Sequence, residues 1–527
     1  MQFTHTFYWA LAVLVVTSLA SANVLAKACA SAASTQGLSH TAWGMDLNST
    51  RHQRHTTINA SNVHQLTPAW SFGLDGDSPH SYPLVSADTI YVGDTDGRVH
   101  ALDRDSGCSR WVFEADAEIR TAMVPGILKT ATGEIPALFF GTFKGSVYAI
   151  RSNDGEQLWQ IVADPHLAAT MTGTPLFYDN VLYAPVSSYE VILAAMPLYG
   201  CCDFRGSMLA LDATTGETIW RTYTVENESK ASTDNLIFPD KMGPSGAPIW
   251  SAPTLDIERQ QILFGSGENY SDPPTAGSDA IWALDMATGK VNWRHQFTQG
   301  DAWNAGCNSW FDSNCPEANG PDLDFGAPPI LIEAGEVDIV LAGQKSANVF
   351  AMKASNGELL WQRDLGRGGM LGGIHWGMAA NPDKSVLYIP INDRILDDSD
   401  IKAAPGLHAL DINTGESIWF TPNSGGCTKA KDNCHNGMSA AIISTPDLVF
   451  AGGLDGRISA YDAETGDTKW SYETWRSFDT VNGVDAHGGA IDTHGPLVIG
   501  DLLIVTSGYA GFGQGGGNTL IVFTLPH

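Results

Sequence analysis

An eleven-residue frame that recurs seven times constrains the fold of this chain more than any other feature. Each copy has Ala in the first place, Gly in the seventh and Trp in the last, as in Ala210–Trp220 (ALDATTGETIW). The other copies begin at Ala101, Ala149, Ala283, Ala351, Ala409 and Ala460. Intervals of roughly 50–70 residues between copies are typical of radial repeat proteins, in which each copy builds one structural unit.

The chemistry of one frame predicts a β-hairpin. A short apolar run, such as Leu448-Val449-Phe450, precedes the frame and suits a buried strand. The polar centre, D-x-x-[TS]-G in most copies, suits a tight turn, because Asp bonds nearby backbone amides and Gly adopts positive φ. The closing Trp then lies on the returning strand, where its indole can cover a neighbouring sheet and its N–H needs a polar partner. One frame is therefore interpreted as one blade of a β-propeller.

Two strand-like segments near the ends predict how the ring closes. Leu66–Phe72 (LTPAWSF) carries a Trp, and Asn518–Leu525 (NTLIVFTL) is apolar. Pairing them adds an eighth blade and removes the open sheet edges. The sequence therefore predicts an all-β fold, an eight-bladed propeller over residues 41–527 whose ring is closed by its N- and C-terminal strands.

The first residues have the pattern of an export signal. Phe7–Ala20 (FYWALAVLVVTSLA) is short for a membrane span, and Ala20-Ser21-Ala22 offers a cleavage site, which predicts a signal peptide over residues 1–22. No Lys or Arg precedes the apolar run, so a retained single-span anchor remains the alternative. Residues 23–40 are small and polar and predict a flexible arm. An exported protein of this kind is periplasmic or secreted.

Charge and cysteine content narrow the range of binding partners and cellular compartments. A formal net charge of −29 disfavours nucleic acid and anionic membrane surfaces as partners. Eight Cys favour an oxidising compartment. Local spacing favours the pairs 307–315 and 427–434 as loop staples and leaves Cys29 to tie the arm to Cys108. Adjacent Cys201 and Cys202 can close a vicinal disulfide, but separate partners or free thiols remain open.

Four insertions interrupt the repeat, and function is expected there because loops carry chemistry that a repetitive scaffold holds rigidly. They are Val186–Ser207, Ser245–Asp272, Gly300–Gly320 and Leu371–Arg394.

The frame and these loops together resemble a known family. The frame is similar to that of the quinoprotein alcohol dehydrogenases, eight-bladed propellers that bind pyrroloquinoline quinone (PQQ) and Ca²⁺. The loop motifs SSYE, CCDFRGS, PSGAPIWSAP, GENYSDP, GDAWNAGC, GQKS, GGIHWG and HGGA resemble the polyvinyl alcohol dehydrogenase branch. The resemblance covers about residue 42 to the C-terminus.

The resemblance implies a set of cofactor-binding residues. Trp250 lies between small residues that let a flat ring approach, and in the family the Trp of this loop stacks on the quinone. The resemblance also implies that a vicinal disulfide at Cys201 and Cys202 contacts the opposite face of the quinone. Lys345 in GQKS corresponds to a basic residue that contacts the quinone in relatives. Weaker correspondences imply further contacts from Arg120, Thr172 and Ser187.

The metal and the base follow from the same resemblance. Glu190 in SSYE lies where the family has its Ca²⁺-ligating Glu, and Glu268 or Asn269 in GSGEN lies near the family's ligating Asn. The family motif D-x-W-D is here Asp301-Ala302-Trp303-Asn304, so Asn304 can coordinate but cannot take a proton, and Asp301 becomes the candidate base. Gly306 replaces the extra Asp of lanthanide-using relatives, which favours Ca²⁺.

Two functions are compatible with this sequence. The first is a PQQ- and Ca²⁺-dependent dehydrogenase that oxidises secondary alcohols, including polyvinyl alcohol or a related polyol. Because the sequence contains no C-x-x-C-H haem motif, a soluble cytochrome c is the expected electron acceptor. The alternative is a cofactor-free propeller that acts as a scaffold or binding protein, which the unusual Asn304 and Glu268 favour.

Overall fold

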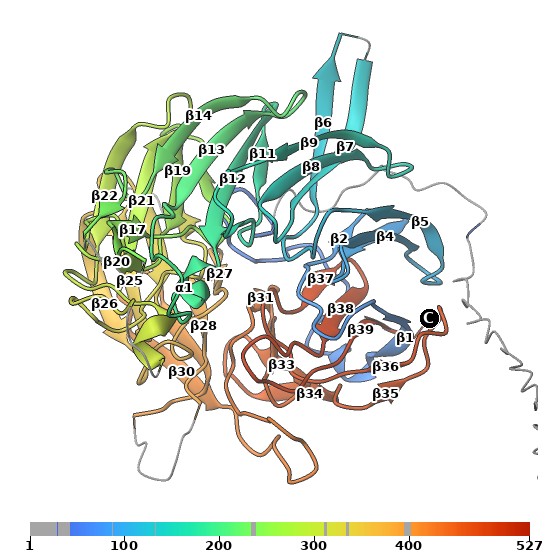
Figure 1. Ribbon diagram of the computed structural model, residues 1–527. Coiled ribbons are helices and arrows are strands. Elements are labelled where there is room, and N and C mark those ends of the chain that lie inside the picture. Colours follow the sequence, from blue (N-terminus) through green and yellow to red (C-terminus); the bar gives the residue numbers. More distant parts are fainter. Residues whose placement is uncertain are drawn as a thin grey trace, which may run out of the picture.

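The computed structural model describes Cys29 and residues 43–526, except for 87, 132, 233–238, 310–313, 334–336 and 395–401. Within these residues eight antiparallel sheets of four or five strands form the blades of the ring in Figure 1. The predicted all-β class and eight-bladed propeller are confirmed. The predicted signal peptide and the predicted arm lie outside the described residues, Cys29 excepted.

The first four blades along the chain contain these strands: β2 (Leu84–Val85), β3 (Thr89–Gly93), β4 (Arg98–Asp103) and β5 (Ser109–Glu114); β6 (Val124–Thr130), β7 (Gly133–Gly141), β8 (Ser146–Arg151) and β9 (Gln157–Val162); β10 (Ala169–Thr170), β11 (Leu176–Tyr178), β12 (Val181–Ser188), β13 (Ser207–Asp212) and β14 (Thr218–Tyr223); β18 (Thr254–Asp256), β19 (Gln261–Gly265), β21 (Ala280–Asp285) and β22 (Val291–Gln296).

The remaining four blades contain β23 (Ile330–Ile332), β24 (Ile339–Gly343), β25 (Asn348–Lys353) and β26 (Leu359–Asp364); β27 (Ala379–Asn381), β28 (Val386–Ile391), β29 (Gly406–Asp411) and β30 (Ser417–Pro422); β31 (Ile443–Ser444), β32 (Leu448–Gly452), β33 (Arg457–Asp462) and β34 (Thr468–Glu473); β37 (Leu497–Ile499), β38 (Leu502–Ser507), β39 (Thr519–Thr524) and β1 (Thr67–Gly73).

Short elements decorate the loops between the blades. The paired strands are β15 (Lys230–Ala231) with β16 (Met242–Gly243), β17 (Ser245–Gly246) with β20 (Asn269–Ser271), and β35 (Ser477–Phe478) with β36 (Ala486–His487). The helical turns are η1 (Val63–Gln65), α1 (Glu190–Leu193) and η2 (Ala305–Asn308). Among the described residues no helix is long and apolar enough to cross a membrane.

The two ends of the propeller pair as the sequence predicts. Strand β1 runs antiparallel to β39, with Trp70 opposite Val522 and Gly73 opposite Thr519. The first and last strands of the propeller therefore share one blade, and this pairing closes the ring.

The repeated frame explains how neighbouring blades pack together. In all seven copies the first-place Ala lies opposite the Trp, as Ala210 lies opposite Trp220. The frame's Gly adopts positive φ, +77° at Gly216, and a Cβ there would lie 3.0 Å from Trp159 of the preceding blade. The Trp159 Nε1 donates to the Ala213 carbonyl at 2.9 Å. Each frame therefore receives the Trp of one blade and supplies a Trp to the next.

All the predicted disulfides are present. Cys29 bonds to Cys108 in the turn between β4 and β5, and the local staples join Cys307 to Cys315 and Cys427 to Cys434. Cys201 and Cys202 form the vicinal disulfide, across a cis peptide bond.

Candidate active site

Loops from several blades line one narrow cavity. Trp250 precedes β18 and Trp376 precedes β27, and their rings meet edge to face with centroids 5.2 Å apart. The full lining consists of Trp43, Thr172, Thr174, Trp250, Ser251, Ala252, Gly326, Pro328, Trp376 and His494. The cavity thus brings together Trp250 and Thr172, two predicted cofactor-binding residues, beside the rings of Trp43 and Trp376.

Several buried polar atoms around this cavity have no hydrogen-bond partner among the described residues. They are Thr172 Oγ1, Ser251 Oγ, Trp376 Nε1 and Arg120 Nε. The Arg120 guanidinium lies over the Trp376 ring, 4.6 Å from its centroid. Buried polar atoms normally find partners, so this concentration favours a ligand with its own polar and negatively charged groups.

Three buried carboxylates and one ammonium adjoin the Trp250 wall of the cavity. Glu268, Asp322 and Asp324 each place a carboxylate oxygen within 4.8 Å of the others. Lys345 Nζ donates to Asp322 Oδ1 and to Asp324 Oδ2, at 2.7 Å in both cases. Trp250 Nε1 also donates to Asp324 Oδ2, at 3.2 Å. One aspartate therefore joins the aromatic wall to the charged cluster.

Burial and mutual charge separate the pKa values of these carboxylates. Burial alone would raise the pKa of Asp324, but the charge of Lys345 and hydrogen bonds outweigh it and hold the pKa well below its usual range. Burial raises the pKa of Asp322 to about 7 despite the nearby Lys345. Burial, reinforced by the charges of Asp324 and Asp322, raises the pKa of Glu268 well above its usual range. The cluster holds more acidic groups than Lys345 can neutralise.

Glu268 carries the atom that best marks a cation site. Its Oε2 is buried and has no hydrogen-bond partner among the described residues. Its backbone N–H donates to Asp324 Oδ1 at 2.8 Å, which holds the two residues together. Three oxygen-donor side chains beside a single ammonium suit a hard cation such as Ca²⁺. The predicted ligand Glu268 therefore lies in a group whose chemistry fits that ion.

Asp301 borders this cluster and is buried, with 6% of its surface exposed. Neither of its carboxylate oxygens has a hydrogen-bond partner among the described residues. Burial raises the pKa of Asp301, and the charge of Asp324 adds to the shift. Asp279 is a second such carboxyl: burial, followed by the charges of Asp324 and Asp301, raises its pKa well above the usual range.

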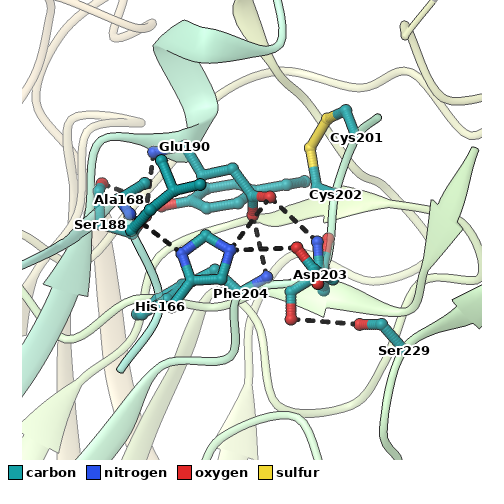
Figure 2. Close-up of polar contacts among 12 residues, drawn as sticks. His166, Ala168, Ser188, Glu190, Cys201, Cys202, Asp203, Phe204 and Ser229 are labelled. Carbon is teal, nitrogen blue, oxygen red and sulfur yellow. Dashed lines mark hydrogen bonds and ion pairs between the residues drawn. A yellow bond between two sulfur atoms is a disulfide. The ribbon is translucent and has the colours of Figure 1, made fainter. Parts of the chain in front are cut away.

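Glu190 lies in a different polar group, which Figure 2 shows. His166, Glu190 and Asp203 place potential ligand atoms within 4.8 Å of one another. Burial raises the pKa of Glu190, against hydrogen bonds from the backbone of Asp203 and Phe204. Tyr270 lies close enough to both carboxylate clusters to be affected by their charges. Burial raises its pKa most, followed by the charges of Glu268, Asp324 and Glu190.

The two predicted asparagine ligands make hydrogen bonds with their surroundings. Asn304 caps η2: its Oδ1 accepts from Gly306 N at 2.8 Å and its Nδ2 donates to the carbonyls of Tyr270 and Asn314, each at 2.8 Å. Asn269 Oδ1 accepts from Thr275 N at 2.6 Å, and its Nδ2 donates to the Ser245 carbonyl at 2.8 Å. Both amides tie loops together.

The remaining predicted residues lie beside these groups. The vicinal disulfide is buried, and Cys201 Sγ lies 4.0 Å from Asn304 Nδ2. Ser187 lies on β12 opposite Thr170 and is buried. The structure thus brings Trp250, Thr172, Arg120, Lys345 and Glu268 to the cavity and its cluster, and places Glu190, Asn304 and the disulfide in a second group of loops.

Asp322 and Asp324 are not among the site residues predicted from the sequence. They lie in the stretch PDLDFG before β23, which has no repeat frame. The signal that could have identified them is a pair of acidic residues that flank one apolar residue shortly before a buried strand. A buried charge is costly unless it is paired with another charge or binds a metal.

An eight-bladed ring whose loops bring together an aromatic cavity, two cationic side chains and a buried carboxylate cluster has the architecture of a propeller enzyme. Comparison with known proteins agrees. The family described as PQQ, glucose/ethanol/alcohol dehydrogenase, beta-propeller domain, matches residues 40–364. The chain belongs to this family and is an oxidoreductase of the PQQ-dependent alcohol dehydrogenase type.

Two relatives are polyvinylalcohol dehydrogenases. One, from Sphingopyxis sp., is 36% identical over 89% of this chain and 72% of its own length. The other, from a Pseudomonas species, is 34% identical over 92% of this chain and 76% of its own length. The solved structure of a quinohemoprotein alcohol dehydrogenase from Comamonas testosteroni shares the fold, with a TM-score of 0.67 and 19% identity over 92% of this chain and 80% of that one.

Proposed function

We propose that this protein is a Ca²⁺-dependent, PQQ-containing dehydrogenase that oxidises secondary alcohol groups, including those of polyvinyl alcohol or a related polyol. The single observation that supports this most is Asp324, which accepts hydrogen bonds from both Trp250 and Lys345 beside Glu268. That contact places an aromatic face, a cation and a carboxylate cluster at one point. The polyol substrate is suggested by the names of the two polyvinylalcohol dehydrogenases.

Residues of this chain would hold the cofactor in three ways. Trp250 offers a flat face and the N–H of Trp376 a donor, while Arg120 and Lys345 offer positive charge to the carboxylates of the quinone. Thr172 and Ser251 offer unpartnered hydroxyls. When bound, the quinone would supply the two-electron oxidant, which no amino-acid side chain provides.

The charged cluster would hold the metal. Glu268, Asp322 and Asp324 supply carboxylate oxygens of the kind that Ca²⁺ prefers, and a divalent charge would allow Glu268 to ionise. Asp324 is the proposed base for the hydroxyl proton, because its Oδ2 accepts a hydrogen bond from Trp250 at the wall of the cavity. Asp301 is the alternative base, because both of its oxygens are free to accept a proton.

The setting of the enzyme is also a proposal. The predicted export signal favours the periplasm or the exterior, and a soluble cytochrome c is the proposed acceptor of the electrons. The buried cluster has three carboxyl groups and a single ammonium, that of Lys345. Burying so many acidic groups would be costly in a protein that binds nothing there, so the cluster does not support the cofactor-free scaffold.

Reconstitution tests this function. The purified protein is incubated with PQQ, with and without Ca²⁺, and dye-linked oxidation of secondary alcohols and of polyvinyl alcohol is measured, alongside quenching of tryptophan fluorescence. We expect quenching and turnover with PQQ and Ca²⁺, and loss of turnover in Asp324→Asn. Quenching without turnover on any secondary alcohol would retain cofactor binding and reject the proposed substrate class.

A further inference from the structure

We propose that Glu190 is a positioning residue that holds the Cys201–Cys202 loop in place, and that it is not a ligand of the metal site. The inference rests on the proposed function, because it concerns which residues build that site. Three observations support it: the hydrogen bonds that Glu190 already accepts, the hydrogen bonds of the His166 ring, and the way three inserted loops interlock around the disulfide.

The carboxylate of Glu190 is engaged on both oxygens. Oε1 accepts from the Tyr199 hydroxyl and from the backbone N–H of Asp203, each at 3.0 Å. Oε2 accepts from the backbone N–H of Phe204, also at 3.0 Å. Figure 2 shows that the two N–H donors directly follow the vicinal disulfide. Glu190 is fully buried, so these donors take the place that water would have around its carboxylate.

His166 supplies a donor to the same group and is a poor metal ligand. Its Nδ1 accepts from Ala168 N at 3.2 Å, so the proton of the neutral ring lies on Nε2. That Nε2 lies 3.0 Å from Asp203 Oδ1 and 3.6 Å from Glu190 Oε1. A metal bound at Nε2 would require the ring proton to lie on Nδ1, where it would point at the N–H of Ala168. His166, Glu190 and Asp203 are therefore a hydrogen-bonded anchor.

The anchored loop contacts strand β16 and two other insertions, Ser245–Asp272 and Gly300–Gly320. Met242 exchanges backbone hydrogen bonds with the disulfide residues, through Cys202 N to Met242 O at 3.2 Å and Met242 N to Cys201 O at 2.8 Å. Asn314 Nδ2 donates to the Tyr199 carbonyl at 3.1 Å and to the Ala194 carbonyl at 3.0 Å. Asn304, beside Cys201, links this assembly to the Tyr270 carbonyl, two residues after Glu268. Glu190 therefore fixes loops that support the metal cluster from outside it.

Glu190→Gln separates the two roles. A Gln amide has one oxygen, so its NH₂ group must face either the Phe204 N–H or the Asp203 N–H, and one donor loses its acceptor. Glu268→Gln is the matched variant in the metal cluster. Tyr199→Phe is a milder variant that removes only the hydroxyl donor to Glu190 and leaves the carboxylate in place.

Two measurements are made on each full-length, oxidised protein. The first is Ca²⁺ affinity by titration calorimetry. The second is the rate at which a phosphine reduces Cys201–Cys202, followed by alkylation and mass spectrometry, with Cys427–Cys434 in the same molecule as an internal control.

We expect Glu190→Gln to keep the Ca²⁺ affinity within about threefold of wild type and to speed reduction of Cys201–Cys202 about tenfold, the order of one lost buried hydrogen bond. Glu268→Gln should weaken Ca²⁺ binding at least about tenfold and leave disulfide reduction unchanged. The opposite pattern, weakened Ca²⁺ binding in Glu190→Gln with an unchanged reduction rate, overturns the proposal.

Failures of the two proposals can be told apart. If the wild-type protein binds no Ca²⁺, the metal part of the proposed function is rejected, and the reduction rate alone decides the role of Glu190. If Glu190→Gln does not fold, Tyr199→Phe decides instead. It should speed reduction of Cys201–Cys202 by a few-fold with unchanged Ca²⁺ affinity, and an unchanged rate would overturn the proposal.

Discussion

Lys345 and Asp324 form a buried ion pair in which Nζ lies 2.7 Å from Oδ2, the oxygen that also accepts the Trp250 indole N–H. Lys345 Nζ lies 5.3 Å from the centroid of the Trp250 ring as well. The carboxylate of Asp324 therefore joins the indole of Trp250 to the ammonium of Lys345. Any group that binds against Trp250 must meet this ion pair.

Lys345→Met should destabilise the protein strongly. It leaves Asp322 and Asp324 buried without their counter-charge, and removing one partner of a buried ion pair costs on the order of 3–5 kcal/mol. Guanidinium unfolding in EDTA measures the loss, and Ca²⁺ should restore part of it. The surface variant Lys353→Met removes an exposed pair with Glu358 and should change stability little. Equal effects of the two variants would contradict a special role for Lys345.

Calcium should stabilise the folded protein through Glu268. A ligand at about 100 times its dissociation constant adds about 2.7 kcal/mol to the stability. Because burial and neighbouring charges raise the pKa of Glu268, the ion must displace a proton, and its affinity should rise from pH 5 to pH 8. Thermal unfolding with and without Ca²⁺ checks this. A shift of the same size in Glu268→Gln would place the ion elsewhere.

The two candidate bases can be separated by kinetics. Loss of a general base lowers kcat by about 10²–10⁴-fold. We expect that loss in Asp324→Asn and a much smaller one in Asp301→Asn, because Asp324 touches the Trp250 wall. The measurement is steady-state oxidation of a secondary alcohol at saturating PQQ and Ca²⁺, with tryptophan quenching to verify cofactor binding. The reverse order of effects would assign the base to Asp301.

The sequence predicted the architecture because both partners of each blade contact lie in the frame itself. Gly216 needs positive φ and a missing Cβ for Trp159, and Trp159 needs the Ala213 carbonyl for its N–H. The contact between a frame glycine and a tryptophan recurs in all seven frames. Ring closure was predictable as well, because β1 and β39 are the segments that the frame count leaves unpaired.

The site was predictable only in part, because its geometry depends on contacts between blades. Trp250 and Lys345 stand out as an aromatic and a cation in loops that the frame does not require. Asp324 does not stand out, and it joins them only after three loops pack together. Similarly, the apolar neighbours of Glu190 predicted burial, but the donors Asp203 N and Phe204 N come from a loop whose path the sequence does not reveal.

Asp279 should make the stability depend on pH. Burial and the charges of Asp324 and Asp301 raise its folded-state pKa, so the folded protein binds the proton more tightly than the unfolded chain. Stability is therefore lost as the pH rises from about 4, near the unfolded pKa, through the folded pKa. Asp279→Asn should raise the denaturant midpoint at pH 7 in EDTA, with the gain vanishing near pH 4. Asp105→Asn, at an exposed turn, is the control, and a gain independent of pH would contradict the explanation.

Substitution of a single frame glycine should test the packing of the blades. In Gly216→Ala the new Cβ would lie 3.0 Å from both Trp159 Cε3 and Ile161 Cγ2, at a φ of +77° that disfavours any Cβ. Backbone strain of this kind costs about 1–3 kcal/mol. The control is Gly425→Ala, which has nearly the same φ, +79°, but meets no heavy atom within 4 Å. Thermal unfolding should show a larger loss for Gly216→Ala than for Gly425→Ala, because only the former also disturbs the Trp159 contact between neighbouring blades. Equal losses would mean that backbone conformation alone, and not the seating of the tryptophan, accounts for the glycine in the frame.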